Sequence, residues 1–321
     1  MRLDFSYILD SDPLPILLHD APVAIRYHTL FRLLELPSDT KVIQGVREEI
    51  LAGDEIQRLE RQQNSDGLWP PATKFTQESH QVGAQFLSQV QHLHQLRDLG
   101  AVREDPFVQK GIVALMKMQL GDGKFPLFFQ HQGYVLWVLL RYGLQGNPYV
   151  ELGLRWLMKR QRNDGGWLHT VQVPRGKKLE NVASCIWTTL HSVWPMSLHS
   201  RYSRDVHVHE GVQYVLDHFL EKNHTKFLNS PDDWNFLYVG HDDLSAFRGG
   251  TLKVLEVASK TGFTLEHPVV KKAARWLREQ QLDNGLFPAI AGKDQDGDPM
   301  VTLRTLLVLK TLYAEKVVTE E

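Results

Sequence analysis

Residues 159–169 read KRQRNDGGWLH, a basic segment with one glutamine that runs into Asn-Asp-Gly-Gly and then into a tryptophan. Glycine tolerates positive φ angles, so the chain can reverse its direction at such a turn. A large indole directly after the turn can then fold back over neighbouring helices. The stretch therefore predicts a helix end that is fastened by an aromatic side chain.

Three further segments repeat this pattern of apolar helix, glutamine, Asp or Asn with Gly, and an aromatic residue. They are IQRLERQQNSDGLWP at 56–70, GIVALMKMQLGDGKFP at 111–126 and KKAARWLREQQLDNGLFP at 271–288. The glutamines are assigned as Gln63, Gln119, Gln161 and Gln280, and the aromatic residues as Trp69, Phe125, Trp167 and Phe287. The last gap spans about two periods, so we expect a degenerate copy at 209–228, without the Gly-aromatic pair.

Each copy is followed by a second segment with helical spacing, at roughly 80–99, 132–142, 182–193, 244–259 and 301–315. The repeating unit is therefore a helix, a glycine turn and a second helix. The second helices are apolar on more than one face, as in GYVLWVLLRYGL at 133–144, and this predicts that they are buried. The first helices carry Lys and Arg and are expected to lie outside.

A glutamine at a helix end followed by Gly-x-aromatic resembles the QW repeat of squalene and oxidosqualene cyclases, and protein prenyltransferase β-subunits carry looser copies. The resemblance covers about residues 50–315. It implies an all-α fold, an α/α toroid of five to six helical hairpins with an inner and an outer ring around a central cavity. Residues 1–50 hold a further helical pair that would complete the ring, and 316–321 form a tail. We expect a single domain, 1–321.

The composition is that of a soluble globular protein: 321 residues, 42% hydrophobic and 23% charged, with net charge −2. No basic face is indicated, so nucleic acid is not an expected partner. A single cysteine, Cys185, excludes an internal disulfide framework and suits a reducing compartment. No apolar run reaches the ~20 residues that a membrane span needs, and the N-terminal segment does not read as a signal peptide. We expect a cytoplasmic protein and leave peripheral membrane contact open.

Polar residues recur at the starts of the expected inner helices, where a toroid places its chemistry. They are His80, His131, Ser184 with Cys185, the run from His241 to Asp243, and the acids between Asp294 and Asp298. The alternative interpretation is structural, because Asp and Ser commonly cap helix N-termini. Both interpretations stay open at this stage.

The resemblance to terpenoid cyclases implies a catalytic acid, the central Asp of an Asp-x-Asp-Asp motif, which burial keeps protonated. The nearest candidate is DQDGDP at 294–299, with Asp294, Asp296 and Asp298. Gly297 departs from the motif, and the surroundings are typical of a solvated loop. Known cyclases of this type are also longer and pair two helical domains.

The resemblance to prenyltransferases implies a Zn²⁺ site with an Asp-x-Cys pair on one inner helix and a His on the next. Cys185 fits the cysteine, but Ala183 stands where the Asp belongs. His131, His241 and Asp242 complete the candidate metal set. A buried structural thiol is the alternative for Cys185. A Mg²⁺ site is less favoured, because HDDLSAF at 241–247 and SPDDWNF at 230–236 are incomplete Asp-rich motifs.

Four aromatic residues of the inner helices are candidate substrate-binding residues: Tyr134, Trp137, Trp187 and Trp194. Aromatic faces in a cavity stabilise cations, although the same residues also pack any buried helix. We therefore expect a protein that resembles terpenoid cyclases and prenyltransferases and binds an apolar, isoprenoid-like ligand. The alternatives are a non-catalytic binding or scaffold module and a metal-dependent enzyme with its site at the cavity mouth.

Overall fold

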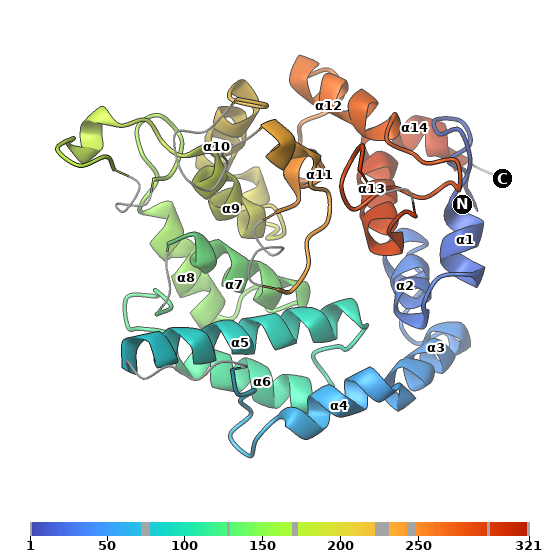
Figure 1. The fold of residues 1–321 in the computed structure, drawn as a ribbon, viewed down its shortest axis with the longest axis horizontal. Coiled ribbons are helices and arrows are strands. Elements are labelled where there is room, and N and C mark those ends of the chain that lie inside the picture. The colour runs from blue at the N-terminus through green and yellow to red at the C-terminus, as the bar shows by residue number, and fades with distance from the viewer. Residues whose placement is uncertain are drawn as a thin grey trace. The chain divides into compact units, whose positions relative to one another are not determined.

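The computed structural model describes residues 2–71, 78–126, 129–168, 173–221, 231–242, 248–293 and 296–319, and Figure 1 shows its helices. They are α1 (Leu14–His19), α2 (Val23–His28), α3 (Lys41–Ala52), α4 (Asp54–Gln62), α5 (Glu78–Asp98), α6 (Pro106–Lys117), α7 (Phe129–Arg141), α8 (Pro148–Met158), α9 (Ile186–Met196), α10 (Val206–Asp217), α11 (Gly250–Lys260), α12 (Pro268–Arg278), α13 (Pro299–Leu312) and α14 (Ala314–Val317). A π-helical turn, Thr29–Leu33, extends α2. Within these ranges the strands are β1 (Arg2–Leu3) and β2 (Val318–Thr319), which pair antiparallel.

The second helix of a hairpin is the more buried one, as the apolar pattern predicts. Every residue of α9 is buried. On α12, which opens the next but one hairpin, the buried residues are confined to one stripe of Val270, Ala273, Ala274 and Leu277. A helix with one apolar stripe lies on the surface of a fold, and a helix apolar all round lies inside it. No helix in the described ranges is both long and apolar enough to cross a membrane.

The four glycine turns share one backbone geometry. Gly67, Gly123, Gly165 and Gly285 have φ angles of 81°, 96°, 82° and 83°. A Cβ at Gly67 would lie 2.6 Å from the backbone oxygen of Lys110, on α6. Both the positive φ and this close approach require glycine. The turn predicted from the sequence is therefore confirmed at all four copies.

The turn glutamines join one outer helix to the start of the next. Gln161 Nε2 donates to the Gly165 oxygen at 2.8 Å and to the His207 oxygen in the first turn of α10 at 2.6 Å. Gln63 and Gln119 do the same toward α6 and α8. These bonds satisfy carbonyl groups that a helix or turn leaves open.

The fourth glutamine is Gln281, and the assignment to Gln280 was wrong. Gln281 Nε2 donates to the Gly285 oxygen at 2.8 Å and to the Ser11 oxygen at 2.9 Å. Within the described part of the chain, the Gln280 side chain bonds only back to the Trp276 oxygen, one turn earlier. Gln281 stands four residues before the turn glycine, as the other three glutamines do. Its bond to Ser11 brings the segment before α1 into the place that the next outer helix takes elsewhere.

The turn aromatics are fully buried, and each is hydrogen-bonded to the following inner helix. Trp69, Phe125, Trp167 and Phe287 are all 0% exposed. The indole N–H groups of Trp69 and Trp167 donate to backbone oxygens of the preceding outer helix, each at 2.8 Å. The four backbone N–H groups donate to side chains on the following inner helix, namely Gln89, Gln132, Thr189 and Thr302. The aromatic residues therefore fasten an outer helix to an inner one.

The degenerate copy also has its aromatic residue, which the sequence pattern did not identify. Trp234 is 0% exposed, and its backbone oxygen accepts a bond from Thr251 Oγ1 at 3.1 Å. The oxygen of Phe125 accepts from Gln132 in the same way. Trp234 lies in a 3₁₀ turn, Pro231–Asn235, within the segment taken as a loop. The expected copy at 209–228 lacks the Gly-aromatic pair, and Trp234, beyond its end, takes the aromatic position without a preceding glycine.

The chain divides into two compact units. Unit 1 comprises Met1–Ile56, Asp98–Gly100 and Asp232–Glu321, and unit 2 comprises Gln57–Arg97 and Ala101–Pro231. Unit 1 joins the N-terminal helices to the last repeat, and β2, in the predicted tail, pairs with β1. The expectation of one domain spanning 1–321, with its internal boundaries, stays a prediction.

Candidate functional site

The fastening bonds define a common register for five inner helices. The side chains that bond a turn aromatic are Gln89 on α5, Gln132 on α7, Thr189 on α9, Thr251 on α11 and Thr302 on α13. Two residues later stand Gln91, Tyr134, His191, Lys253 and Arg304. Five residues later stand His94, Trp137, Trp194, Glu256 and Leu307. These two positions are three residues apart and share one helix face, and most of their side chains are large and polar or aromatic.

In unit 2 this face forms an aromatic cluster, which we define as His94, Tyr134, Trp137, His191 and Trp194. The Tyr134 hydroxyl lies 2.9 Å from His94 Nδ1. The Trp137 and Trp194 rings stack with centroids 3.9 Å apart, and His94 meets Trp137 edge-on at 5.0 Å. His191 meets Trp194 edge-on at 6.0 Å. Five rings from three helices are thus in mutual contact and buried.

The stack depends on a close approach of α7 and α9. A Cβ added at Gly133 would overlap the backbone oxygen of His191. Only glycine lets the two backbones meet here, and this meeting brings Trp137 against Trp194. The sequence gives this role no local signal, because Gly133 lies inside a helix.

Cations border one side of the aromatic cluster. The Arg141 guanidinium lies over the Trp137 ring, 4.6 Å from its centroid. Arg97 Nε donates to the Arg141 backbone oxygen at 3.0 Å. Both arginines stand in the last turns of their helices, where positive charge is favourable. Trp187 reaches the cluster through His191, with ring centroids 4.8 Å apart.

In unit 1 the same face carries Lys253, Glu256 and Arg304, which together with the nearby Tyr238 we define as the charged cluster. Arg304 binds Glu256 in a two-point ion pair, with Nε–Oε1 at 2.8 Å and Nη2–Oε2 at 2.6 Å. Lys253 is 0% exposed, although it is a lysine in the middle of a helix face. Buried charges of this kind are rare unless they are paired.

Burial and charge perturb the acid–base chemistry of the charged cluster. Burial, together with the neighbouring Arg304, lowers the Lys253 pKa well below 10.5. Burial alone would raise the Glu256 pKa, but the charge and hydrogen bonds of Arg304, with smaller contributions from Lys260 and Arg32, hold that pKa below 4.5. Burial, with a smaller contribution from Asp98, raises the Tyr238 pKa to about 12. A lysine with a depressed pKa is a candidate base or nucleophile.

The acidic motif before α13 divides into a cap and an exposed residue. Asp298 Oδ1 accepts the backbone N–H groups of Met300 and Val301 at 2.8 and 2.9 Å, so Asp298 is the N-cap of α13. Asp296 is exposed and lacks the burial that a cyclase-type acid requires. Asp294 lies outside the described residues. A catalytic role for these acids stays a prediction.

The candidate metal residues are in separate settings. Cys185 is buried and caps α9, where its Sγ accepts the Thr188 backbone N–H at 3.3 Å. His131 and His241 are half-buried and Asp242 is exposed. Among the described residues there is no group of three or more His, Cys, Asp and Glu side chains that could hold a metal ion. The side chain of His80, together with Asp243 and 244–247, lies outside the described residues, and the Zn²⁺ and Mg²⁺ sites stay predictions.

All four residues of the charged cluster, and both histidines of the aromatic cluster, were missed by the sequence analysis. Lys253 and Glu256 lie in TLKVLEVA at 251–258, where two charges three residues apart interrupt an otherwise apolar helix. That spacing puts both charges on one face of a buried helix. The two charges were therefore visible in the sequence. Their meaning becomes clear only after the inner helices are aligned through their fastening residues.

Comparisons with known proteins identify the fold and no family. No family model and no curated protein matches the chain. A glycosyl hydrolase family 88 protein from Bacteroides vulgatus matches with 13% identity and a TM-score of 0.50, over 90% of each chain. A polysaccharide lyase matches with 14% identity and a TM-score of 0.48, over 93% of this chain and 91% of the other. A type II terpene cyclase from Scytonema matches with 12% identity and a TM-score of 0.33, over 82% and 98%.

These similarities bear on architecture alone. At 13% identity, the match to the family 88 protein shows a shared fold and carries no substrate or residue role to this chain. The predicted fold class is confirmed: the regular secondary structure of the described residues is almost entirely helical, and the fold is of the α/α-toroid class. Function has to be argued from the side chains themselves.

Proposed function

We propose that this chain binds an apolar, isoprenoid-like ligand against the aromatic cluster. The observation that carries the proposal is the stack of Trp137 on Trp194, with His94 and His191 edge-on beside it. Aromatic faces attract both apolar chains and cationic centres, whereas aliphatic side chains attract only the former. The resemblance of the turns to the QW repeat supports the same ligand class.

The cluster also contains one acid–base pair, Tyr134 with His94, at 2.9 Å. A hydroxyl that is hydrogen-bonded to an imidazole can pass a proton to or from a bound ligand. This pair favours a catalytic role over a passive binding module. Product analysis after incubation with squalene or geranylgeranyl diphosphate separates the two: binding without a new product supports the binding module.

The binding test uses farnesol and geranylgeraniol, titrated into the purified protein by calorimetry. Trp194→Leu removes the stack but keeps an apolar side chain, and we expect it to weaken binding about tenfold. Trp276→Leu is the matched control, because Trp276 is half-buried on α12, outside the aromatic cluster. Equal affinity of both variants, or no binding by the wild type, would contradict the proposal.

A second arm of the test uses oligosaccharides, because a glycosyl hydrolase is among the structural matches. Stacked indoles also bind sugar rings, so this arm is a direct competitor of the isoprenoid proposal. Binding of the oligosaccharides with no binding of either isoprenoid alcohol would replace the proposed ligand class.

The metal-dependent enzyme remains the alternative proposal, built on Cys185 with His131, His241 and Asp242. Its test is elemental analysis of the purified protein together with the Cys185→Ser variant. Stoichiometric zinc that is lost in Cys185→Ser would support it. Metal-free protein whose thermal stability does not change in chelator would remove it.

A further inference from the structure

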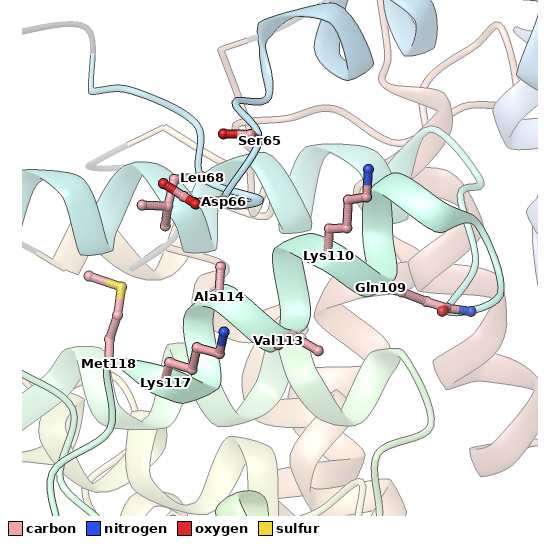
Figure 2. Close-up of a pocket in the computed structure, with 9 residues that line it drawn as sticks. All are labelled: Ser65, Asp66, Leu68, Gln109, Lys110, Val113, Ala114, Lys117 and Met118. Atoms are coloured by element: carbon pink, nitrogen blue, oxygen red, sulfur yellow. The ribbon is translucent and has the colours of Figure 1, made fainter.

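A hollow of about 700 Å³ lies on unit 2, between the first glycine turn and the outer face of α6. Figure 2 shows Gln109, Lys110, Val113, Ala114 and Lys117 along α6 and Met118 just after it, with Ser65, Asp66 and Leu68 on the opposite side. Its floor is apolar and its rim is polar. The hollow is outside the aromatic cluster, so what it binds is independent of the proposed function.

The outer helices α6, α8 and α10 can be aligned residue by residue. Each begins after a capping position, Asp105, Asn147 or Asp205, and carries a glycine six residues later. Nine residues after the capping position stand Ala114, Trp156 and Tyr214. The three positions face equivalent turns, since Gly67 meets α6 and Gly123 meets α8 in the same manner. One position thus carries a large aromatic side chain in two copies and a methyl group in the first.

On α8 this position is filled by an indole. Trp156 Nε1 donates to Asp122 Oδ2 of the second turn at 3.1 Å. The Arg160 guanidinium covers one face of the ring, 3.6 Å from its centroid. The Lys124 backbone N–H and, after it, the Trp156 indole help to hold the Asp122 pKa below 3.8. The site therefore combines an indole, a carboxylate acceptor and a covering side chain.

On α10 the same position is filled by a phenol. Tyr214 is buried, and its hydroxyl donates to the Ser184 backbone oxygen at 2.6 Å. The His218 ring lies against it, tilted by 49°, with centroids 4.6 Å apart. His218 stands four residues after Tyr214, as Arg160 does after Trp156. The aromatic residue is thus a regular part of this interface between turn and helix.

On α6 the covering residue and the carboxylate acceptor are present, but the aromatic side chain between them is missing. Ala114 takes the place of the ring, and Met118 takes the covering position. Asp66 corresponds to Asp122, the residue before the turn glycine. Asn64 bonds the Leu68 backbone N–H at 2.9 Å, so Asp66 is not needed to hold the turn. No described residue donates a hydrogen bond to the Asp66 carboxylate.

We propose that the hollow binds a tryptophan side chain of a partner polypeptide, with the indole on Ala114 and Met118 and its N–H donated to Asp66. The arrangement reproduces between two molecules the contact that Trp156 makes with Asp122 within this one. Lys110 and Lys117 stand on the rim, exposed, two helical turns or about 10 Å apart, and without an ion pair among the described residues. Acidic residues on both sides of the tryptophan complement them.

A second copy of this chain does not fit the hollow well. Its eight tryptophans all lie in the described ranges. Seven of them are buried, and only Trp276 is half-exposed. The Trp276 segment, ARWLR at 274–278, is basic, and the rim of the hollow is also basic, so the two surfaces would repel each other. The partner is therefore a different polypeptide with an acidic, tryptophan-containing segment.

The test titrates a peptide with one tryptophan between glutamates into the full-length protein, followed by fluorescence anisotropy of a label on the peptide. The same peptide with phenylalanine lacks the N–H donor, and we expect at least tenfold weaker binding. Ala114→Trp fills the hollow with an indole of the chain itself, as on α8, and should abolish binding while raising the melting temperature. Ala114→Ser is the matched control and should bind as the wild type does.

Two further variants test the polar contacts. Asp66→Ala removes the acceptor from an exposed position and should weaken binding about tenfold without loss of folding. Lys110→Gln with Lys117→Gln should flatten the dependence of affinity on salt. If Ala114→Trp does not fold, Asp66→Ala decides the matter.

Several results would overturn the proposal: no binding of the tryptophan peptide, equal affinity for the phenylalanine peptide, or full binding by a folded Ala114→Trp or Asp66→Ala variant. N-acetyltryptophanamide is the last probe. If it binds as tightly as the peptide, the hollow is a site for free indole compounds, and the partner polypeptide is excluded.

Discussion

The inner helices α7 and α9 and the inner helices α11 and α13 use the same two register positions for opposite chemistry. On α7 they carry Tyr134 and Trp137, and on α11 they carry Lys253 and Glu256. The turns that fasten these helices bond them in the same manner, through a side chain that meets the turn aromatic. The comparison shows that the turns set how outer helices pack on inner ones. The helix face two and five residues after the fastening side chain can then carry either aromatic or charged residues.

The two faces differ in how they contribute to stability. Buried aromatic rings stabilise the fold by removing apolar surface from water and by contact with one another. The buried Arg304–Glu256 pair has to offset the desolvation of two charges, so its net contribution is small. Breaking such a pair is nevertheless costly, because it leaves one charge without its partner. Substitutions should therefore separate the two regions clearly.

The largest effect is expected for Glu256→Leu. Arg304 and Lys253 then share a buried site without the carboxylate that binds Arg304 at 2.6 Å. We expect the free energy of unfolding to fall by about 4 kcal/mol, the cost of one unpaired buried charge. Urea denaturation followed by circular dichroism measures it.

The control for this prediction removes the whole charged set. The triple variant Lys253→Met, Glu256→Leu and Arg304→Met replaces charges by apolar side chains of similar length. Because an apolar replacement of a buried ion pair is often neutral or better, we expect it to recover most of the lost stability. A triple variant that is as unstable as the single one would show that the charges hold the fold through contacts other than their own pairing.

The next effect concerns the aromatic face. Gly133→Ala puts a methyl group into the backbone of His191, so α7 and α9 must separate and the Trp137–Trp194 stack must loosen. Overpacking of this kind costs about 3 kcal/mol. Gly83→Ala on α5 is the matched control, because nothing lies within 4 Å of its added Cβ. It should be neutral or stabilise by about 0.5 kcal/mol; similar losses in both variants would refute the close-approach argument.

A smaller effect should separate the two adjacent glutamines of the fourth turn. Gln281→Leu removes the donor to Gly285 and Ser11 and the acceptor of the Asp10 backbone N–H, and we expect a loss of about 2 kcal/mol. Gln280→Leu removes one bond to the same helix and should cost about 0.5 kcal/mol. Thermal and urea unfolding of both variants measures the difference. Equal losses would mean that the turn is not held by its glutamine.

This pair of glutamines shows how far the sequence allowed the fold to be predicted. Periodicity and composition were enough for the repeats, the glycine turns and the buried aromatics, because each is a local pattern. The choice between Gln280 and Gln281 depends on the spacing of four residues to Gly285, which only Gln281 has, and the sequence analysis assigned Gln280. Trp234 was missed because Asp232 and Asp233 precede it, whereas the other four turn aromatics each have a glycine two residues earlier.

The candidate site was harder to predict, because its residues are related by register and not by motif. Cys185 was a candidate metal ligand and Asp298 a candidate catalytic acid, and in the structure both cap helices. Lys253 and Arg304 stand two residues after a fastening threonine, and nothing in a single helix marks that position. Similarly, the importance of Ala114 appears only beside Trp156 and Tyr214.

The smallest effect is the pH dependence of Lys253. Since burial and Arg304 lower its pKa in the folded protein, the unfolded chain binds this proton more tightly. The buried proton therefore lowers the free energy of unfolding by its full amount when the pH is below the pKa that Lys253 has in the folded protein. The penalty is relieved as pH rises from there toward 10.5, the ordinary lysine value. Lys253→Met lacks the proton, and we expect it to stabilise the protein by about 1 kcal/mol at neutral pH.

The advantage of Lys253→Met over the wild type should shrink as pH rises toward 10.5. Glu256 and Arg304 face Lys253 and keep their charges through this range, so they contribute equally to both proteins. Tyr238 titrates near 12 and stays protonated until the end of the range. Urea unfolding of both proteins at pH 7, 8.5 and 10 gives the difference directly. A constant difference would mean that Lys253 keeps its proton in the folded protein, and the charged cluster would then hold two cations against one carboxylate.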